Sequence, residues 1–181
     1  MIVGVTGFFA AGKDTVAEIL QERGFRHVSL SDIIREEIRS RGEEVTIPLL
    51  TAVGNELRAQ HGPQVLAERA LALLPADGDA VVTSIRHSAE VEALRGRPDF
   101  RMVFVDAPIR MRYERSRSRA RGGDPVSFFE FQSAERAQME SHDPNAQQLA
   151  KCRELADAIV INDQTPVELE EKVARVVEQK G

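Results

Sequence analysis

Residues 7–15, which read Gly-Phe-Phe-Ala-Ala-Gly-Lys-Asp-Thr, have the spacing of a loop that binds the phosphates of a nucleotide. An apolar run precedes this loop and a helical pattern follows it, which is the strand–loop–helix context that the motif requires. Backbone N–H groups of the loop, together with the start of the helix, would form a concave site for anions. We therefore predict that ATP binds to Gly7, Phe8, Phe9, Ala10, Ala11, Gly12, Lys13, Asp14 and Thr15.

The loop departs from the usual pattern at position 14. Lys13 would reach the β- and γ-phosphates as a point charge, and Thr15 would donate its hydroxyl to the α-phosphate. Position 14 is Asp, where the pattern has a hydroxyl that helps to hold Mg²⁺. A carboxylate also holds Mg²⁺, directly or through water, so Asp14 is the predicted metal ligand. The alternative is an acid that the dipole of the first helical turn favours.

Polar residues also follow the second apolar run, 27–30. Asp32 and Arg35 lie one helical turn apart, so both would project on the same face of a helix. They are candidates for acceptor binding, with Asp32 as a general base if the acceptor is a hydroxyl. A salt bridge on a solvated helix face explains their spacing equally well.

The third apolar run, 80–85, ends in Thr83-Ser84-Ile85-Arg86. Thr83 and Ser84 stand where a phosphate-loop enzyme keeps an acid for Mg²⁺. Arg86 leaves the carboxyl end of the strand and is expected to face the cleft, although a pair with Glu90 is the alternative.

Six arginines occur between residues 110 and 121. On a helix, Arg112, Arg115 and Arg119 form one stripe, and Arg110, Arg117 and Arg121 form another nearly opposite. One stripe would face the cleft and neutralise charge that develops on the γ-phosphate, while the other stays solvated. An RNA-binding patch is the alternative, but the net charge of −5 and the single tyrosine argue against it.

The elements that would position these residues are five apolar runs separated by helical patterns: 2–6, 27–30, 80–85, 102–105 and 158–161. Continuous Val/Ile runs are typical of parallel strands buried on both faces. The alternation predicts a doubly wound α/β fold over a single domain, 1–181. Two helical insertions, 31–74 and 108–155, would lie at the carboxyl ends of strands, where such sheets bind ligands.

Composition narrows the class of protein. Apolar residues make up 42% and charged residues 29%, as in globular domains. The single cysteine excludes an internal disulfide and fits a reducing cytoplasm. No apolar run approaches the roughly 20 residues that span a bilayer, and the acidic total disfavours nucleic acid. We expect a cytoplasmic protein without membrane or nucleic-acid partners, and the oligomeric state stays open.

With these motifs in order, the chain resembles phosphate-loop (P-loop) kinases of the nucleoside monophosphate kinase group. It is close to dephospho-CoA kinase-like proteins, and closer still to prokaryotic kinase-like ATP-binding proteins with a G-K-D-T loop. Residues 31–35 resemble the segment S/T-G-D-x-x-R, and residues 83–86 resemble D-G-x-(P)-R with its Asp and Gly both replaced. Residues 112–121 resemble the start of a lid, and residues 156–163 resemble A-D-x-V-I-x-N-D.

The resemblance implies a three-layer α/β/α fold around a five-stranded parallel sheet. It implies ATP and Mg²⁺ as cofactors, with Asn162 beside the nucleotide and the 31–74 insertion over the acceptor. The implied acceptor residues are Asp32, Arg35, Arg86 and, more weakly, Arg58. The implied catalytic residues are Lys13, Asp14, Asp32, Arg86, Arg115 and Arg119.

Three functions remain open at this point. The first is ATP-dependent phosphoryl transfer to a small phosphorylated acceptor, above all a (deoxy)nucleoside monophosphate. The second is transfer to a hydroxyl, as in dephospho-CoA. The third is a regulatory ATPase, which the unusual residues at positions 14 and 83 favour.

Overall fold

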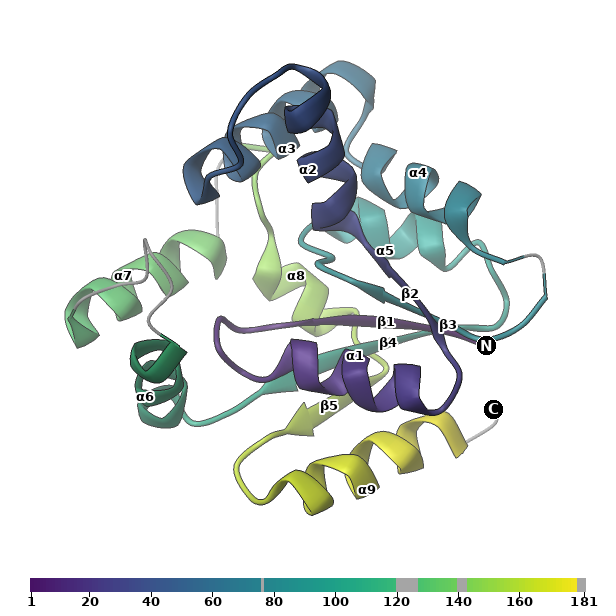
Figure 1. The fold of residues 1–181 in the computed structure, drawn as a ribbon, viewed down its shortest axis with the longest axis vertical. Helices are drawn as coiled ribbons and strands as arrows, with labels where there is room; N and C mark the ends of the chain where they lie inside the picture. The colour runs from purple at the N-terminus through teal and green to yellow at the C-terminus, as the bar shows by residue number, and fades with distance from the viewer. Residues whose placement is uncertain (76, 120–126, 140–142, 179–181) are drawn as a thin grey trace.

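A computed structural model of the chain describes residues 1–75, 77–119, 127–139 and 143–178, apart from the side chains of residues 119, 137 and 138. Its centre is a five-stranded sheet in the order β2-β3-β1-β4-β5, and every neighbouring pair is parallel (Figure 1). The strands are β1 (Ile2–Gly7), β2 (Arg26–Ser29), β3 (Ala80–Thr83), β4 (Phe100–Asp106) and β5 (Ala158–Ile161). The predicted parallel α/β sheet is confirmed, although β3 ends before Ser84.

Helices cover both faces of the sheet, and the alternation of side chains along each strand decides which face each residue joins. In β4, Val103 and Val105 pack with α1 (Lys13–Glu22) and α9 (Pro166–Glu178). Met102 and Phe104 point the other way and join a larger core. The helices of that second core are α2 (Leu30–Ser40), α3 (Ile47–His61), α4 (Val65–Leu73), α5 (Ser88–Leu94) and α8 (Leu149–Glu154). The result is the predicted α/β/α arrangement.

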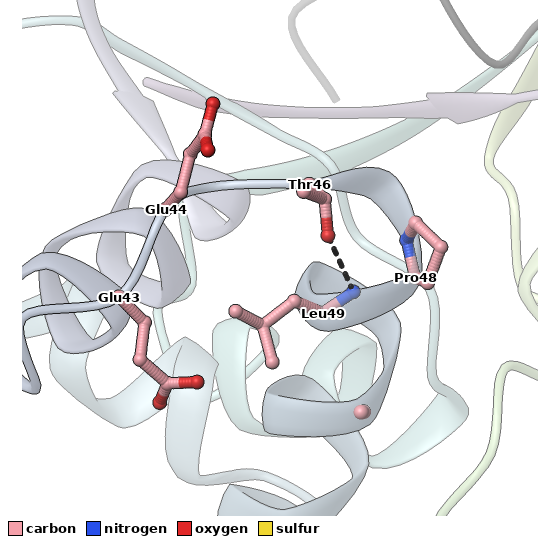
Figure 2. Close-up of a pocket in the computed structure, with 6 residues that line it drawn as sticks. Glu43, Glu44, Thr46, Pro48 and Leu49 are labelled. Carbon is pink, nitrogen blue, oxygen red and sulfur yellow. Dashed lines mark hydrogen bonds between the residues drawn. The ribbon is translucent and has the colours of Figure 1, made fainter.

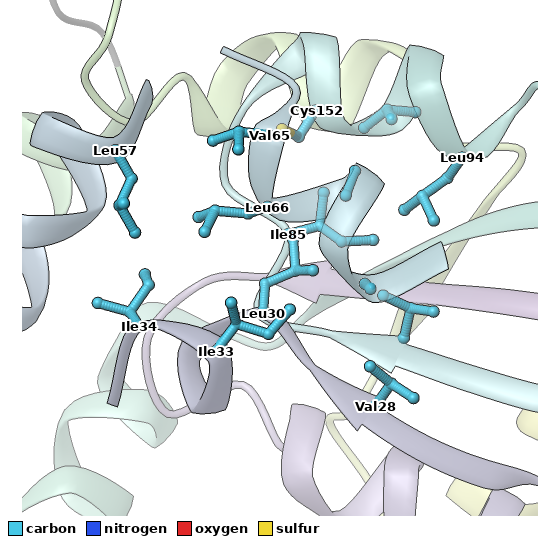
Figure 3. Close-up of a cluster of buried hydrophobic side chains, with 14 of the residues drawn as sticks. Val28, Leu30, Ile33, Ile34, Leu57, Val65, Leu66, Ile85, Leu94 and Cys152 are labelled. Atoms are coloured by element: carbon cyan, nitrogen blue, oxygen red, sulfur yellow. The ribbon is translucent and has the colours of Figure 1, made fainter. Parts of the chain in front are cut away.

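The first predicted insertion is α2, α3 and α4, which follow one another between β2 and β3. Its apolar side chains meet the end of β3 in one buried cluster, which contains Leu30, Leu57, Leu66 and Ile85 (Figure 3). Burial of aliphatic side chains is the main stabilising term here, at about 1.5–3 kcal/mol for each one. This cluster therefore fixes the insertion over the carboxyl end of β3.

The second predicted insertion contains α6 (Ile109–Arg119) and α7 (Phe128–Met139), followed by α8. Helices α6 and α7 lie beside the carboxyl ends of the strands, where the loop between β1 and α1 emerges (Figure 1). In the described part of the chain, no helix combines the length and the apolar character needed to cross a membrane.

Candidate nucleotide and acceptor site

The loop between β1 and α1 has a backbone that only glycine fits at two positions. Gly7 has φ +146°, and a Cβ there would lie 2.0 Å from the carbonyl oxygen of Val105. Gly12 has φ +100°, and a Cβ there would lie 2.2 Å from Nδ2 of Asn162. The motif glycines are therefore required by the fold of this loop, and the strand–loop–helix context predicted from the sequence is present.

The start of α1 has the backbone features of an anion site. Gly12, its N-cap, supplies no side-chain cap, so the first N–H groups of the helix have no side-chain acceptor from that residue. Ala10 joins Gly12 in the left-handed region at φ +57°, a pattern that turns successive N–H groups to one side. Lys13 Nζ donates to the carbonyl oxygen of Phe8 at 2.6 Å. Thr15 is half-buried and Asp14 is exposed in the same turn.

The two phenylalanines of the loop anchor it to the sheet and to α6 and α7, the helices of the predicted lid. The Phe8 ring packs edge-on against Phe104 of β4, with centroids 5.1 Å apart. The guanidinium of Arg112 lies 4.6 Å from the centroid of the same ring. Phe9 packs against Phe131 of α7 at 5.8 Å. The sequence predicted Phe8 and Phe9 only as loop residues, and their anchoring role needs partners that lie far away along the chain.

Helix α6 divides its arginines as the helical spacing predicted. Arg110 and Arg117 are exposed, whereas Arg112 is buried and forms an ion pair with Glu135 of α7. Arg115 turns inward, donating from Nη2 to the carbonyl oxygen of Asn162 at 3.1 Å. The predicted catalytic side chain of Arg119 lies outside the described residues.

Asn162 joins the phosphate loop to α6 and β5. Its Nδ2 donates to the carbonyl oxygen of Ala11 at 2.9 Å, and its own carbonyl accepts from Arg115. Nη1 of Arg115 is buried and has no hydrogen-bond partner among the described residues. A buried donor without a partner costs about 1–3 kcal/mol, so this position suits an anionic group. The loop, the start of α1 and Arg115 therefore bring together donors of the kind that bind phosphates.

Residues that could hold a metal are few. No group of three or more His, Cys, Asp or Glu side chains comes together in the described part of the chain. Mg²⁺ in phosphoryl-transfer sites needs only one or two carboxylates, because substrate phosphates supply other ligands. Asp14 fits that limited requirement. Thr83 is committed elsewhere, since its Oγ1 hydrogen-bonds Nε2 of His27 at 2.7 Å.

The first predicted acceptor residues lie on α2. Arg35 and Asp32 form the salt bridge that their spacing allowed, with Nη1 and Oδ1 2.8 Å apart. The same Nη1 donates to Oγ of Ser31 at 2.7 Å, and Ser31 lies 3.3 Å from Oγ of Ser84. Arg35 therefore contacts a group of serine hydroxyls at the carboxyl ends of β2 and β3. Ser84 reaches this group with φ +65°, in the left-handed region that favours glycine.

Arg86 follows Ser84 by two residues, and its guanidinium reaches the phosphate loop. Its Nη1 is 3.4 Å from the carbonyl oxygen of Gly7, at the start of the phosphate loop. Burial lowers the pKa of Arg86, and the nearby carboxylates of Glu90 and Asp14 oppose that shift. Glu90 accepts from the backbone N–H of Arg86, and no described carboxylate accepts a hydrogen bond from its guanidinium. The side-chain pair considered from the sequence is therefore replaced by a backbone contact.

Arg58 requires a correction. It is only 4% exposed, and its Nη2 lies 2.9 Å from Oε1 of the fully buried Glu90. A guanidinium engaged in this way is not available to a ligand, so we withdraw Arg58 from the acceptor site. Sequence reasoning missed Glu90 as its partner because the two residues are 32 positions apart.

An open hollow of about 520 Å³ lies beside the segment that joins α2 to α3 and the start of α3 (Figure 2). Its lining is acidic and aliphatic: Glu43, Glu44, Thr46, Pro48, Leu49 and Ala52. Thr46 caps α3 by accepting from the backbone N–H of Leu49 at 3.3 Å. The hollow belongs to the insertion predicted to bind the acceptor.

Similar known proteins show the family of this chain. No protein-family model matches the chain. It is 33% identical over 186 residues to a UPF0200 protein of Thermococcus gammatolerans. The match covers 99% of this chain and 95% of that protein. The chain belongs to the UPF0200 family. A UPF0200/UPF0201 protein of Archaeoglobus fulgidus is 31% identical over 97% of the chain, and the chain spans 54% of that longer relative.

Solved structures show the fold of this UPF0200 chain. A protein of Thermus thermophilus superimposes with a TM-score of 0.62 at 24% identity, covering 100% of the chain and 98% of its own. Shikimate kinase of Acinetobacter baumannii, in complex with shikimate, superimposes with a TM-score of 0.60 at 19% identity. The superposition covers 98% of this chain and 92% of the kinase chain. The UPF0200 chain therefore has the fold of P-loop kinases.

Proposed function

We propose that the chain transfers the γ-phosphoryl group of ATP to a small phosphorylated acceptor, above all a (deoxy)nucleoside monophosphate. The observation that carries this proposal is the position of Arg86. It lies within 3.4 Å of the phosphate loop, and Ser84, two residues earlier, contacts the Ser31 hydroxyl to which Arg35 donates. A cation between a nucleotide site and an acceptor site is suited to bridging two phosphates that must react.

On the nucleotide side, Lys13 and the N–H groups at the start of α1 would bind the β- and γ-phosphates. Arg115, whose Nη1 has no hydrogen-bond partner in the described ranges of the chain, would supply a further donor. Asn162 would keep the loop and Arg115 in register through its two hydrogen bonds. Mg²⁺, held by Asp14 and the nucleotide, would neutralise phosphate charge when bound.

On the acceptor side, Arg35 and Arg86 would hold the phosphate of the acceptor. A phosphate acceptor is already an anion and needs no general base. A hydroxyl acceptor would need one, and the carboxylate of Asp32 is engaged by Arg35 at 2.8 Å. An anionic phosphate could displace Asp32 from Arg35, whereas an uncharged hydroxyl could not, and this difference supports the monophosphate over dephospho-CoA.

ADP release from Mg-ATP, measured against a panel of ribo- and deoxynucleoside monophosphates and dephospho-CoA, tests the proposal. We expect one monophosphate to stimulate release. We also expect Arg35→Met to raise its KM about tenfold or more, since a charge-assisted hydrogen bond contributes about 1.5–3 kcal/mol. Arg39→Met is the matched control, because Arg39 is exposed on the same helix.

The other outcomes separate the alternatives. Stimulation by dephospho-CoA alone would transfer the proposal to a hydroxyl acceptor and give Asp32 a catalytic role. Tight ATP binding without any acceptor-dependent turnover would contradict a kinase and leave the regulatory ATPase.

A further inference from the structure

Glu90 is a carboxylate with no exposed surface that accepts four hydrogen bonds. Its Oε2 accepts from the backbone N–H groups of Arg86 at 2.8 Å and His87 at 3.0 Å. Its Oε1 accepts from Nε and Nη2 of Arg58 at 3.0 Å and 2.9 Å. One side chain thus joins the exit of β3 to helix α3 of the acceptor insertion.

The backbone of Arg86 is held from both sides. Glu90 accepts from its N–H group, and its carbonyl oxygen accepts from the backbone N–H of Gln148 at 2.8 Å. Gln148 also accepts from the hydroxyl of Ser88 at 3.0 Å. The chain direction at Arg86, and hence the origin of its guanidinium beside Gly7, depends on these contacts.

The segment that leads from the lid helices into α8 meets the same junction. Nη1 of Arg58 donates to the carbonyl oxygen of Asn145 at 3.5 Å. Nδ1 of His87 accepts from the N–H of Ala89, so its Nε2 carries the proton and donates to the carbonyl oxygen of Pro144 at 2.8 Å. The acceptor insertion, the exit of β3 and the segment after the lid therefore share one buried set of polar contacts.

A buried ion pair of this kind is weak evidence for stability. The free energy needed to remove two charges from water offsets much of the free energy gained from their attraction. Proteins in which apolar or neutral residues of similar volume replace such a pair are often as stable. A better account of the pair is geometric, because its contacts determine where other groups lie.

We propose that Glu90 and Arg58 are positioning residues that align Arg86 with the acceptor insertion and with the segment returning from the lid. The inference rests on the proposed function, since Arg86 is the group positioned for phosphoryl transfer. Both side chains are buried, so neither would touch the substrate. Through their contacts, the position of α3 and the position of Arg86 depend on each other.

The double variant Glu90→Gln/Arg58→Met tests this role. Glutamine keeps an oxygen for the N–H groups of Arg86 and His87, and methionine removes the cation that glutamine would leave unpaired. We expect a thermal midpoint close to that of the wild type and above that of Glu90→Gln alone, with an unchanged Kd for ATP. We also expect a KM for the acceptor raised about tenfold, as expected for the loss of one link in a coupled network.

The matched control is Arg41→Met/Glu56→Gln, which removes an exposed ion pair between the end of α2 and α3 of the same insertion. This control should leave the acceptor KM unchanged. A double variant at Glu90 and Arg58 with restored stability and unchanged KM would overturn the inference while leaving the proposed function intact.

A second measurement does not depend on turnover. Amide hydrogen exchange at Arg86 and Gln148 should quicken about tenfold in the Glu90/Arg58 double variant and stay unchanged in the control. Glutamine still offers an oxygen to the N–H of Arg86, but a neutral oxygen accepts more weakly than a carboxylate, and the link to α3 is lost. Unchanged exchange would overturn the inference. Absence of turnover in the wild type would instead overturn the proposed function.

Discussion

Ser84 gives a specific prediction about stability, because its backbone conformation destabilises the fold while its hydroxyl contacts stabilise it. Its φ of +65° lies in the left-handed region, which costs a non-glycine residue roughly 1–2 kcal/mol. Its hydroxyl lies 3.2 Å from Ser29 and 3.3 Å from Ser31, longer than the usual hydroxyl hydrogen bond of about 2.7–2.8 Å. The strain is therefore only partly offset by the contacts.

Replacement by alanine keeps the strain and removes the contacts, so we expect Ser84→Ala to lose about 0.5–1 kcal/mol. Replacement by glycine removes both, at the cost of about 0.4–1 kcal/mol of additional unfolded-state entropy, so we expect Ser84→Gly to be nearly neutral. Glycine should thus be more stable than alanine at position 84 by about 0.5–1 kcal/mol. This is the reverse of the usual order.

Urea unfolding of four variants measures the reversal. Ser133 is exposed within α7, where Ser133→Ala should be more stable than Ser133→Gly by about 1 kcal/mol. If alanine also proves the more stable residue at position 84, the strain assigned to Ser84 is wrong.

Four shorter predictions follow from other contacts. Lys13→Met should weaken ATP binding about tenfold to a hundredfold in titration calorimetry, because the γ-phosphate loses a charged donor. Arg112→Met should lower the unfolding free energy by about 3 kcal/mol, since it leaves Glu135 without its buried partner; a loss near zero in urea would contradict this. Burial raises the pKa of Cys152 to about 12, so iodoacetamide at pH 8 should label the native thiol at least about a hundredfold more slowly than the unfolded one, as mass spectrometry would show. Hydrogen bonds from Thr165 lower the pKa of Glu168 below its usual 4.5. Its carboxylate therefore stabilises the fold above that pH and loses this effect as the pH falls through the lowered value, and Glu168→Gln should flatten stability against pH there.

The sheet and the phosphate loop were predictable because their signals are local. A continuous apolar run such as Ile2–Thr6 and a glycine spacing such as Gly7 to Gly12 need no information from distant residues. The alternation of strands and helices then leaves few ways to arrange a parallel sheet. Arg35 and Asp32 paired as their helical spacing allowed for the same reason.

The roles of Arg58 and Arg112 were not predictable from spacing. Their partners Glu90 and Glu135 lie 32 and 23 positions away, and only the packed fold brings these charges together. One local signal for Glu90 did exist. It lies three residues after His87 and just before the apolar Val91, the place of the glutamate in a capping box. Because His87 is an unusual N-cap, that signal is faint.

The proposed reaction moves phosphate from the nucleotide in the loop to a second small molecule. Its most direct test follows the label of [γ-³²P]ATP in the presence of Mg²⁺ and the stimulating monophosphate, with Lys13→Met as the inactive reference. We predict that the label appears in the corresponding nucleoside diphosphate, at a rate equal to ADP release. Label found only in inorganic phosphate would contradict the account.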